Sequence, residues 1–238
     1  MGALALACLS ACGGGSNSVP SASSTVTYKF ITPINGSQST FAETLVDNLN
    51  NSVNRNLLEK VTAVNSDGTF TTVEEDPSND SIISGTVDHT FYPSTYIHNY
   101  AGQVTSLTTS NASGVAISCV ASPNLAGAPS PLAVGQNWAF SFTETCNSAA
   151  PIDLTQTGTF VDAESVTVPA GTFNAYKFES TIVYTLNGTT VTKLVTHWVN
   201  ASSSDSRALK TITAYSYSGT APAQGSLVSD TLLLQNFQ

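Results

Sequence analysis

An Asn-Gly pair at positions 187 and 188 lies between two runs in which apolar and polar residues alternate, and no other feature restricts the fold of this chain as strongly. A two-residue type I′ turn needs positive φ at both positions, which asparagine and glycine adopt most easily. The pair therefore predicts a β-hairpin. It also fixes the register, because Tyr184 then faces Val191.

Alternation along this hairpin assigns its side chains to two faces of a sheet. We expect one face to line the interior of a curved sheet and to contact a ligand there. Its members are Tyr176, Phe178, Ile182, Tyr184, Val191, Val195, His197 and Val199. The opposite face is mostly polar and carries a patch of Leu194 and Trp198. This patch is a candidate protein-interaction surface, since exposed aromatics mark interfaces.

Short alternating segments separated by turn sequences continue along most of the chain. Val26, Tyr28 and Phe30 alternate with polar residues, and residues 65–68 form a turn sequence between two further runs. Counting such runs gives about twelve strands and little helix. The expected fold is a single all-β domain over residues 25–238, an antiparallel meander curled into a barrel or half-barrel.

The segment at residues 39–64 allows two interpretations. Apolar residues recur at every fourth position, which is typical of an amphipathic helix. Asparagines crowd the middle of the segment, however, and asparagine prefers turns to helices. We favour two strands joined by a turn near residues 48–52, and a helix is the alternative. The recurring residues are Phe41, Leu45, Leu49, Val53, Leu57 and Val61.

Composition restricts the partners of this chain. Hydrophobic residues make up 41%, which is ample for a core, whereas charged residues make up only 10%. Ser, Thr and Asn must therefore supply the polar surface, and they suit exposed sheet faces and turns. The net charge of −9 would repel a phosphate backbone, so we expect no nucleic-acid partner. For the same reason we expect that an anionic membrane surface would not attract the body of the protein either.

The first twelve residues have the order of an export signal, with an apolar run followed by small residues and a cysteine. The sequence Leu9-Ser10-Ala11-Cys12 resembles the bacterial lipobox. The resemblance implies cleavage before Cys12, a diacylglyceryl group on its sulfur and an acylated α-amino group. With glycine after the cysteine, it also implies the outer membrane of the cell envelope. Residues 13–24 would then be a flexible Gly/Ser tether.

Two features of this signal leave alternatives open. The segment before the apolar run contains no Lys or Arg, and the apolar run is short, which suggests a start further upstream. Cys8 is a second candidate for lipidation, although Ala5 lies where a lipobox has leucine. A buried N-terminal helix that ends in cysteine is the structural alternative.

Cys119 and Cys146 are the cysteines that remain outside the signal. Two cysteines in an exported protein predict one disulfide, here one that closes a loop of moderate length. A two-thiolate metal site is the alternative. Neither cysteine has a second Cys or a His close to it in sequence, so we favour the disulfide.

Motifs for catalysis, phosphate binding and dinucleotide binding are absent from the sequence. We therefore expect a protein that is not an enzyme and has no catalytic residue, metal or cofactor. The three histidines are isolated in sequence, and we expect the one at position 197 to be a core histidine with satisfied hydrogen bonds. The acidic residues between positions 74 and 80 lack EF-hand spacing, so we expect a solvated acidic loop.

The stretch from Gly158 to Glu179 has Val-Pro-Ala-Gly-Thr-Phe at its centre, and a hairpin, Trp198 and a loop ending at Lys210 follow it. This order resembles a segment of bacterial lipoproteins of unknown function, in half-barrel domains similar to DUF3108 and to the carriers LolA and LolB. The resemblance covers residues 132–214. Its shared residues form turns and packing contacts, so it implies a fold and no activity.

These observations lead to two hypotheses about function. The first is an envelope lipoprotein, anchored to the membrane, that binds an apolar small molecule or lipid in a cavity of the curved sheet. The second is a structural or interaction lipoprotein that holds another envelope protein. A hydrolase whose site is assembled from distant residues is a third and weaker possibility.

Overall fold

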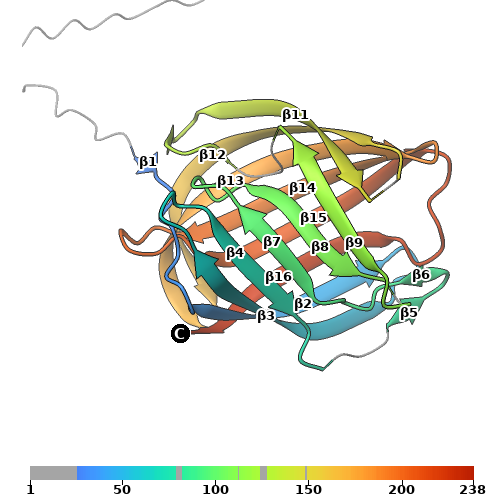
Figure 1. The fold of residues 1–238 in the computed structure, drawn as a ribbon, viewed down its shortest axis with the longest axis horizontal. Helices are drawn as coiled ribbons and strands as arrows, with labels where there is room; N and C mark the ends of the chain where they lie inside the picture. Colours follow the sequence, from blue (N-terminus) through green and yellow to red (C-terminus); the bar gives the residue numbers. More distant parts are fainter. Residues whose placement is uncertain (1–25, 79–81, 112, 124–127, 148) are drawn as a thin grey trace, which may run out of the picture.

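A computed structural model describes residues 26–238 apart from 79–81, 112, 124–127 and 148 (Figure 1). Twelve of its strands form a closed antiparallel barrel. Each barrel strand pairs with the next barrel strand along the chain, and β16 finally pairs with β2. The predicted all-β antiparallel meander is therefore confirmed, and it closes as a full barrel. Within the described residues, no helix has the length and hydropathy needed to cross a bilayer.

The strands have the following bounds. The barrel consists of β2 (Gln38–Asp47), β3 (Ser52–Val64), β4 (Phe70–Glu75), β7 (Ser94–His98), β8 (Val104–Ser110), β9 (Ala116–Ser122), β11 (Asn137–Cys146), β12 (Ile152–Val168), β13 (Gly171–Leu186), β14 (Thr189–Asn200), β15 (Ala208–Gly219) and β16 (Leu227–Phe237). Two short pairs lie outside the barrel, namely β1 (Thr27–Tyr28) with β10 (Leu132–Ala133) and β5 (Ile83–Ser84) with β6 (Val87–Asp88).

The segment at residues 39–64 is the predicted pair of strands, β2 and β3, and not a helix. A spacing of four is also a multiple of two, so residues four apart lie on one face of a strand as well as near one face of a helix. Phe41 and Leu45 on β2 and Leu57 and Val61 on β3 are all buried. Leu49 lies in the connecting turn and is exposed.

The Asn-Gly hairpin connects β13 and β14 as predicted. Asn187 has φ of 50° and Gly188 has φ of 80°, so both positions have the positive φ that the turn requires. Tyr184 pairs with Val191 and Phe178 pairs with His197, as the turn predicts. Two local signals were therefore sufficient to place twelve paired positions in register.

Replacing Gly188 by alanine tests how much this turn contributes. An L-residue with a Cβ is strained at positive φ, and the new Cβ would lie 3.0 Å from Thr220 Oγ1. We expect the free energy of unfolding to fall by about 1 kcal/mol, measured by urea denaturation. Leu186→Ala, at an exposed position next to the turn, should change it by less than about 0.5 kcal/mol. Equal effects of the two changes would contradict the assigned turn.

Residues 26–37, here called the strap, cross one end of the barrel before the chain enters β2. The backbone N–H of Phe30 donates to Ser130 Oγ and that of Ile31 donates to Ser206 Oγ, each at 2.8 Å. Gly36 N–H then donates to the Val61 carbonyl on β3 at 2.9 Å. The strap end of the barrel also carries the C-terminus, whereas β5 and β6 lie at the opposite, far end (Figure 1).

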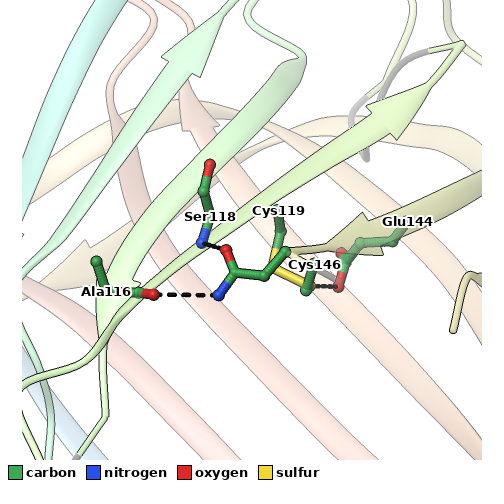
Figure 2. The surroundings of a disulfide bond; sticks show 6 residues. Ala116, Ser118, Cys119, Glu144 and Cys146 are labelled. Carbon is green, nitrogen blue, oxygen red and sulfur yellow. Dashed lines mark hydrogen bonds between the residues drawn. A yellow bond between two sulfur atoms is a disulfide. The ribbon is translucent and has the colours of Figure 1, made fainter. Parts of the chain in front are cut away.

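Cys119 on β9 and Cys146 on β11 form the predicted disulfide, with a Cα–Cα distance of 3.9 Å (Figure 2). The two residues are direct cross-strand partners in one of the shorter pairings of the barrel, which runs from Thr143 with Ser122 to this pair. Asn147 adds two hydrogen bonds between these segments. Its Oδ1 accepts from Ser118 N–H at 2.9 Å, and its Nδ2 donates to the Ala116 carbonyl at 3.1 Å. The disulfide therefore fastens β9 to β11.

Candidate functional site

Ionisable side chains line the inside of the barrel, and the alternation within single strands did not predict this. Alternation on β2, β3, β4, β7, β14, β15 and β16 directs one face of each strand inward. The inward ionisable residues from these strands include Glu43, Arg55, Glu59, Glu74, Tyr96, His98, Lys193, His197, Tyr215, Tyr217 and Asp230. The interior therefore combines acids, bases and phenols from both halves of the barrel.

The barrel is hollow. Two cavities lie inside it next to the strap, and Glu59 lines one of them. Burial raises the pKa of the Glu59 carboxyl and lowers the pKa of the Lys193 ammonium, because charge is costly to remove from water. Both residues keep part of their accessible surface.

Burial also shifts the pKa of the other groups in this lumen. It raises the pKa of Glu74 to about 8 and that of Asp230 to about 7, and nearby carboxylates add to both shifts. It lowers the pKa of His98 and His197 to about 4. Each shift favours the uncharged form of the group, because charge is costly to bury. Glu43 and Arg55 instead form a buried ion pair, and Arg55 Nη1 also donates to the His89 carbonyl at 2.6 Å.

Aromatic rings line the lumen next to the strap. Tyr28 of the strap packs edge-on against Phe178 with ring centroids 4.9 Å apart, and Phe160 stacks on Phe178 at the same distance. The Trp138 ring lies over Gly158, where a Cβ would come within 2.1 Å of it. Gly158 therefore makes room for the indole at the cavity wall.

A cavity of about 260 Å³ lies among these rings. Its aromatic and aliphatic lining consists of Tyr28, Phe30, Trp138, Phe178, Ile182, Val195 and Val199. Gln156, Ser180, His197 and Ser206 add polar groups. Indole Nε1 of Trp138 and Oε1 of Gln156 are buried and have no hydrogen-bond partner among the described residues. An unpartnered buried donor and acceptor are costly, so this wall is prepared for a polar contact.

A second cavity of about 230 Å³ adjoins the first and shares Phe30, Gly102, His197 and Ser206 with it. Its lining is more polar and includes Glu59 and Arg207. His98 is fixed here, because its ring stacks on Phe70 and its Nε2 lies 2.9 Å from Thr72 Oγ1. Together the two cavities approach the size of a small-molecule site.

A larger hollow of about 780 Å³ lies on the barrel wall. It is lined mainly by outward residues of β11 to β14, among them Thr157, Thr159, Thr181 and Thr196. Exposed hydroxyl groups that water already satisfies offer a ligand little gain in binding energy. The lumen cavities are therefore the better candidates for a binding site.

The structure brings together most of the residues predicted for the ligand face. Phe178, Ile182, Val195 and His197 all line the cavity of about 260 Å³. Tyr184 lies further along the lumen, where its ring is 5.5 Å from Lys193 Nζ. Tyr176 packs at the strap, with its ring 5.7 Å from that of Tyr28.

The proposed patch of Leu194 and Trp198 is not an exposed aromatic surface, and this prediction was wrong. Leu194 is 53% exposed, but Trp198 is only 8% exposed. Trp198 Nε1 donates to Glu164 Oε1 at 2.6 Å, and Lys210 Nζ lies 4.8 Å from the indole ring. Val166, Val168 and Ala175 of the long β12–β13 hairpin pack in one buried cluster with the indole. Alternation within β14 cannot predict such contacts with another segment.

Two expectations about ionisable residues have different outcomes. His197 has the hydrogen bond expected of a core histidine, since its Nδ1 lies 2.7 Å from Thr211 Oγ1, but it lines both cavities and is not in a filled core. The solvated acidic loop is wrong for Glu74, which ends deep in the lumen, and for Asp76, which is buried. The missed signal was alternation, because Phe70, Thr72 and Glu74 occupy one face of β4.

The alternative of a thiolate metal site is excluded by the disulfide. Cys119, Glu144 and Cys146 lie close enough together to suggest a metal group, and Figure 2 shows Glu144 beside Cys146. The sulfurs are bonded to each other, however, and a metal requires free thiolates. The predicted lipidation site Cys12, its alternative Cys8 and the tether at residues 13–24 lie outside the described residues.

Comparison with known proteins shows the fold. No protein family model matches this chain, so the DUF3108 and LolA/LolB resemblance is not shown. No curated protein matches it either. A Bacteroides fragilis protein described as exported and as having a YmcC-like fold is similar over 88% of this chain and 99% of its own, with TM-score 0.51 and 14% identity.

Two further solved structures are similar to the chain at lower TM-scores. One is a Parabacteroides distasonis protein described as a lipoprotein, with TM-score 0.44, 13% identity, and coverage of 87% of this chain and 97% of its own. The other is Escherichia coli YmcC, described as a hypothetical lipoprotein, with TM-score 0.41, 9% identity, and coverage of 86% of each chain. Only the first of the three TM-scores exceeds 0.5. That comparison indicates that this chain has a YmcC-like fold.

Proposed function

We propose that this protein is a lipid-anchored protein of the bacterial envelope that binds a small, largely apolar molecule in the strap end of its lumen. The observation that carries the proposal is the cavity of about 260 Å³, with aromatic walls and an unpartnered donor and acceptor on Trp138 and Gln156. Pockets of this kind, mainly apolar with a few polar groups, are typical of small-molecule sites.

Envelope localisation is supported by the sequence and by the fold. The lipobox-like Leu9-Ser10-Ala11-Cys12 supplies the attachment site, and two or three acyl chains on one cysteine would give lasting membrane attachment. The Bacteroides fragilis protein with the same fold is described as exported. A disulfide is also typical of exported proteins.

The proposed activity is binding without catalysis. A catalytic histidine needs access to a nucleophile and a pKa near the working pH. His98 and His197 are each held by a threonine hydroxyl, and burial lowers their pKa to about 4. These two histidines are therefore better suited to shape the cavity wall than to transfer protons.

Titration with the uncharged dye N-phenyl-1-naphthylamine tests the site, using residues 16–238 produced in an oxidising compartment. We expect saturable fluorescence enhancement in the wild type. Ser180→Leu, which places a larger side chain in the cavity, should weaken dye binding by roughly tenfold or more. Native mass spectrometry with solvent extraction of the same sample would identify any molecule that co-purifies.

Thr181→Leu is the matched control, since this neighbouring residue faces out of the barrel opposite Leu194. It should leave dye binding unchanged. Loss of binding in both variants, or in neither, would rule out the cavity as the binding site. A wild type that binds no dye and carries no extractable molecule would instead favour the structural or interaction role, and partner capture in the envelope would then be the next experiment.

A further inference from the structure

Basic residues are distributed unevenly along the barrel axis. The chain has seven Lys and Arg in total, and two of them, Arg55 and Lys193, point into the lumen. The other five all lie in the half of the molecule that contains the strap. They are Lys29, Lys60, Lys177, Arg207 and Lys210.

Acidic residues accompany these five bases in similar number. Asp67, Asp162, Glu164, Glu179 and Asp205 lie in the same half. Several acids and bases pair there, since Lys177 Nζ lies 3.2 Å from Glu179 Oε1 and Arg207 pairs with Asp205. Glu75 belongs here too, since it lies 3.0 Å from Lys60 Nζ. Six acids and five bases leave the outside of this half close to neutral.

The far half carries the negative charge. Asp88 and Asp153 are exposed there, Asp47 and Asp76 are buried, and Glu144 lies on the inner face opposite Ala121. Among the described residues, no basic residue lies on the outer surface of this half. Hydrogen bonds from Ser84, Asn51 and Leu49 lower the pKa of Asp47 to about 2, so this group is charged at neutral pH. The net charge of −9 is therefore concentrated in the far half and the lumen.

Exposed apolar side chains alone do not distinguish the two ends. The strap end exposes Val26, Ile34, Tyr100 and Phe237, with Ile34 at 74% and Tyr100 at 70%. The far end exposes Leu49, Ile83, Val115 and Leu186, with Ile83 at 70%. Apolar side chains of either rim would fit a bilayer surface. Anionic headgroups would repel the acidic far end but not the nearly neutral strap end.

Chain connectivity selects the same end. Residues 1–25, including the proposed lipidation site Cys12, join the barrel at Val26 in the strap. An acyl anchor on Cys12 therefore holds the strap end closest to the membrane. Charge distribution and connectivity are independent observations, and both assign the same face.

We infer that the barrel rests on a phospholipid bilayer through its strap end, with Ile34 and Tyr100 in the headgroup region. The inference rests on the proposed lipid anchor. It also deepens the proposed function, because the strap residues Tyr28 and Phe30 that line the cavity then separate it from the bilayer. A membrane-derived amphiphile is the ligand class that this arrangement would admit.

Depth-dependent quenching of the full, lipidated protein tests the inference. Ile34→Cys and Ile83→Cys are matched variants, because both replace an exposed isoleucine, one at each end. Each is labelled with a fluorophore and incorporated into vesicles of phosphatidylethanolamine with a minority of phosphatidylglycerol and nitroxide-labelled lipid. We expect quenching at position 34 to be roughly threefold stronger than at position 83.

Equal quenching at the two positions, or stronger quenching at position 83, would overturn the inference. Protein that fails to float with the vesicles would overturn both the anchor and the inference. Lys29→Glu combined with Tyr100→Ser should reduce quenching at position 34 if the rim contacts the bilayer. Dye binding is measured in solution without vesicles. It therefore tests the ligand site independently of the membrane contact, which the quenching experiment tests.

Discussion

Replacing Cys119 and Cys146 together by serine is expected to lower the free energy of unfolding by about 3–4 kcal/mol. The disulfide closes a loop with a sequence separation of 27, and the open chain gains the corresponding entropy when it is removed. In the folded state the same bond joins β9 to β11, which share only a short run of paired residues. Urea denaturation of both proteins at neutral pH measures the difference.

The disulfide variant should also show a local effect. Backbone amides of β9 and β11 should exchange with solvent faster than those of β13 and β14, which share a much longer pairing. Ser118→Ala, which changes an outward residue next to Cys119, is the matched control and should change stability by less than about 0.5 kcal/mol. A loss below about 1 kcal/mol in the serine variant would show that the pairing holds without the bond.

Glu74→Gln is expected to make the protein more stable than the wild type at alkaline pH by roughly 2–4 kcal/mol. Burial inside the barrel, together with the nearby Glu59, raises the pKa of Glu74 from 4.5 to about 8. The two side chains belong to residues that pair directly across β3 and β4. Glutamine has nearly the same shape as the protonated acid and cannot ionise.

The sign follows from proton linkage. The native state binds the Glu74 proton more tightly than the unfolded chain does, so its contribution is fully present below pH 4.5. It is lost as the pH rises through about 8, where the buried carboxylate must form. Wild type and Glu74→Gln should therefore have similar stability at acidic pH and diverge at alkaline pH in urea denaturation series.

Glu75→Gln provides the matched control for this experiment. Glu75 is the next residue on β4, faces outward and lies 3.0 Å from Lys60 Nζ. An exposed ion pair contributes at most about 1 kcal/mol, and its loss should not depend on pH in the alkaline range. If Glu74→Gln and Glu75→Gln had the same pH dependence, Glu74 would not be the buried acid that the structure indicates.

Local signals in the sequence were sufficient for much of the fold. Asn187 and Gly188 set the turn, and alternation then placed Tyr184 opposite Val191. The asparagines near position 50 separated β2 from β3 in a segment whose spacing also fitted a helix. The cysteine count, together with the expected export signal, predicted the disulfide. The turn and the break between β2 and β3 depend on the backbone preferences of nearby residues, and the disulfide depends on the number of cysteines.

Burial depended on contacts between distant segments, and there the sequence was insufficient. Trp198 faces outward on β14, as alternation predicts, but Val166, Val168 and Ala175 of the β12–β13 hairpin pack with it in one buried cluster. Glu74 was assigned to a loop because acidic residues usually remain in water, yet β4 turns it into the lumen.

The sequence by itself determined that this chain forms antiparallel strands, where one well-marked turn lies and which cysteines pair. Only the tertiary structure decided that the barrel closes, that it is hollow and lined with ionisable groups, and that the strap forms one wall of the cavities. The physical reason is the range of the interactions. Turn geometry and alternation act over a few residues, whereas closure and burial require β16 to find β2 across nearly the whole chain.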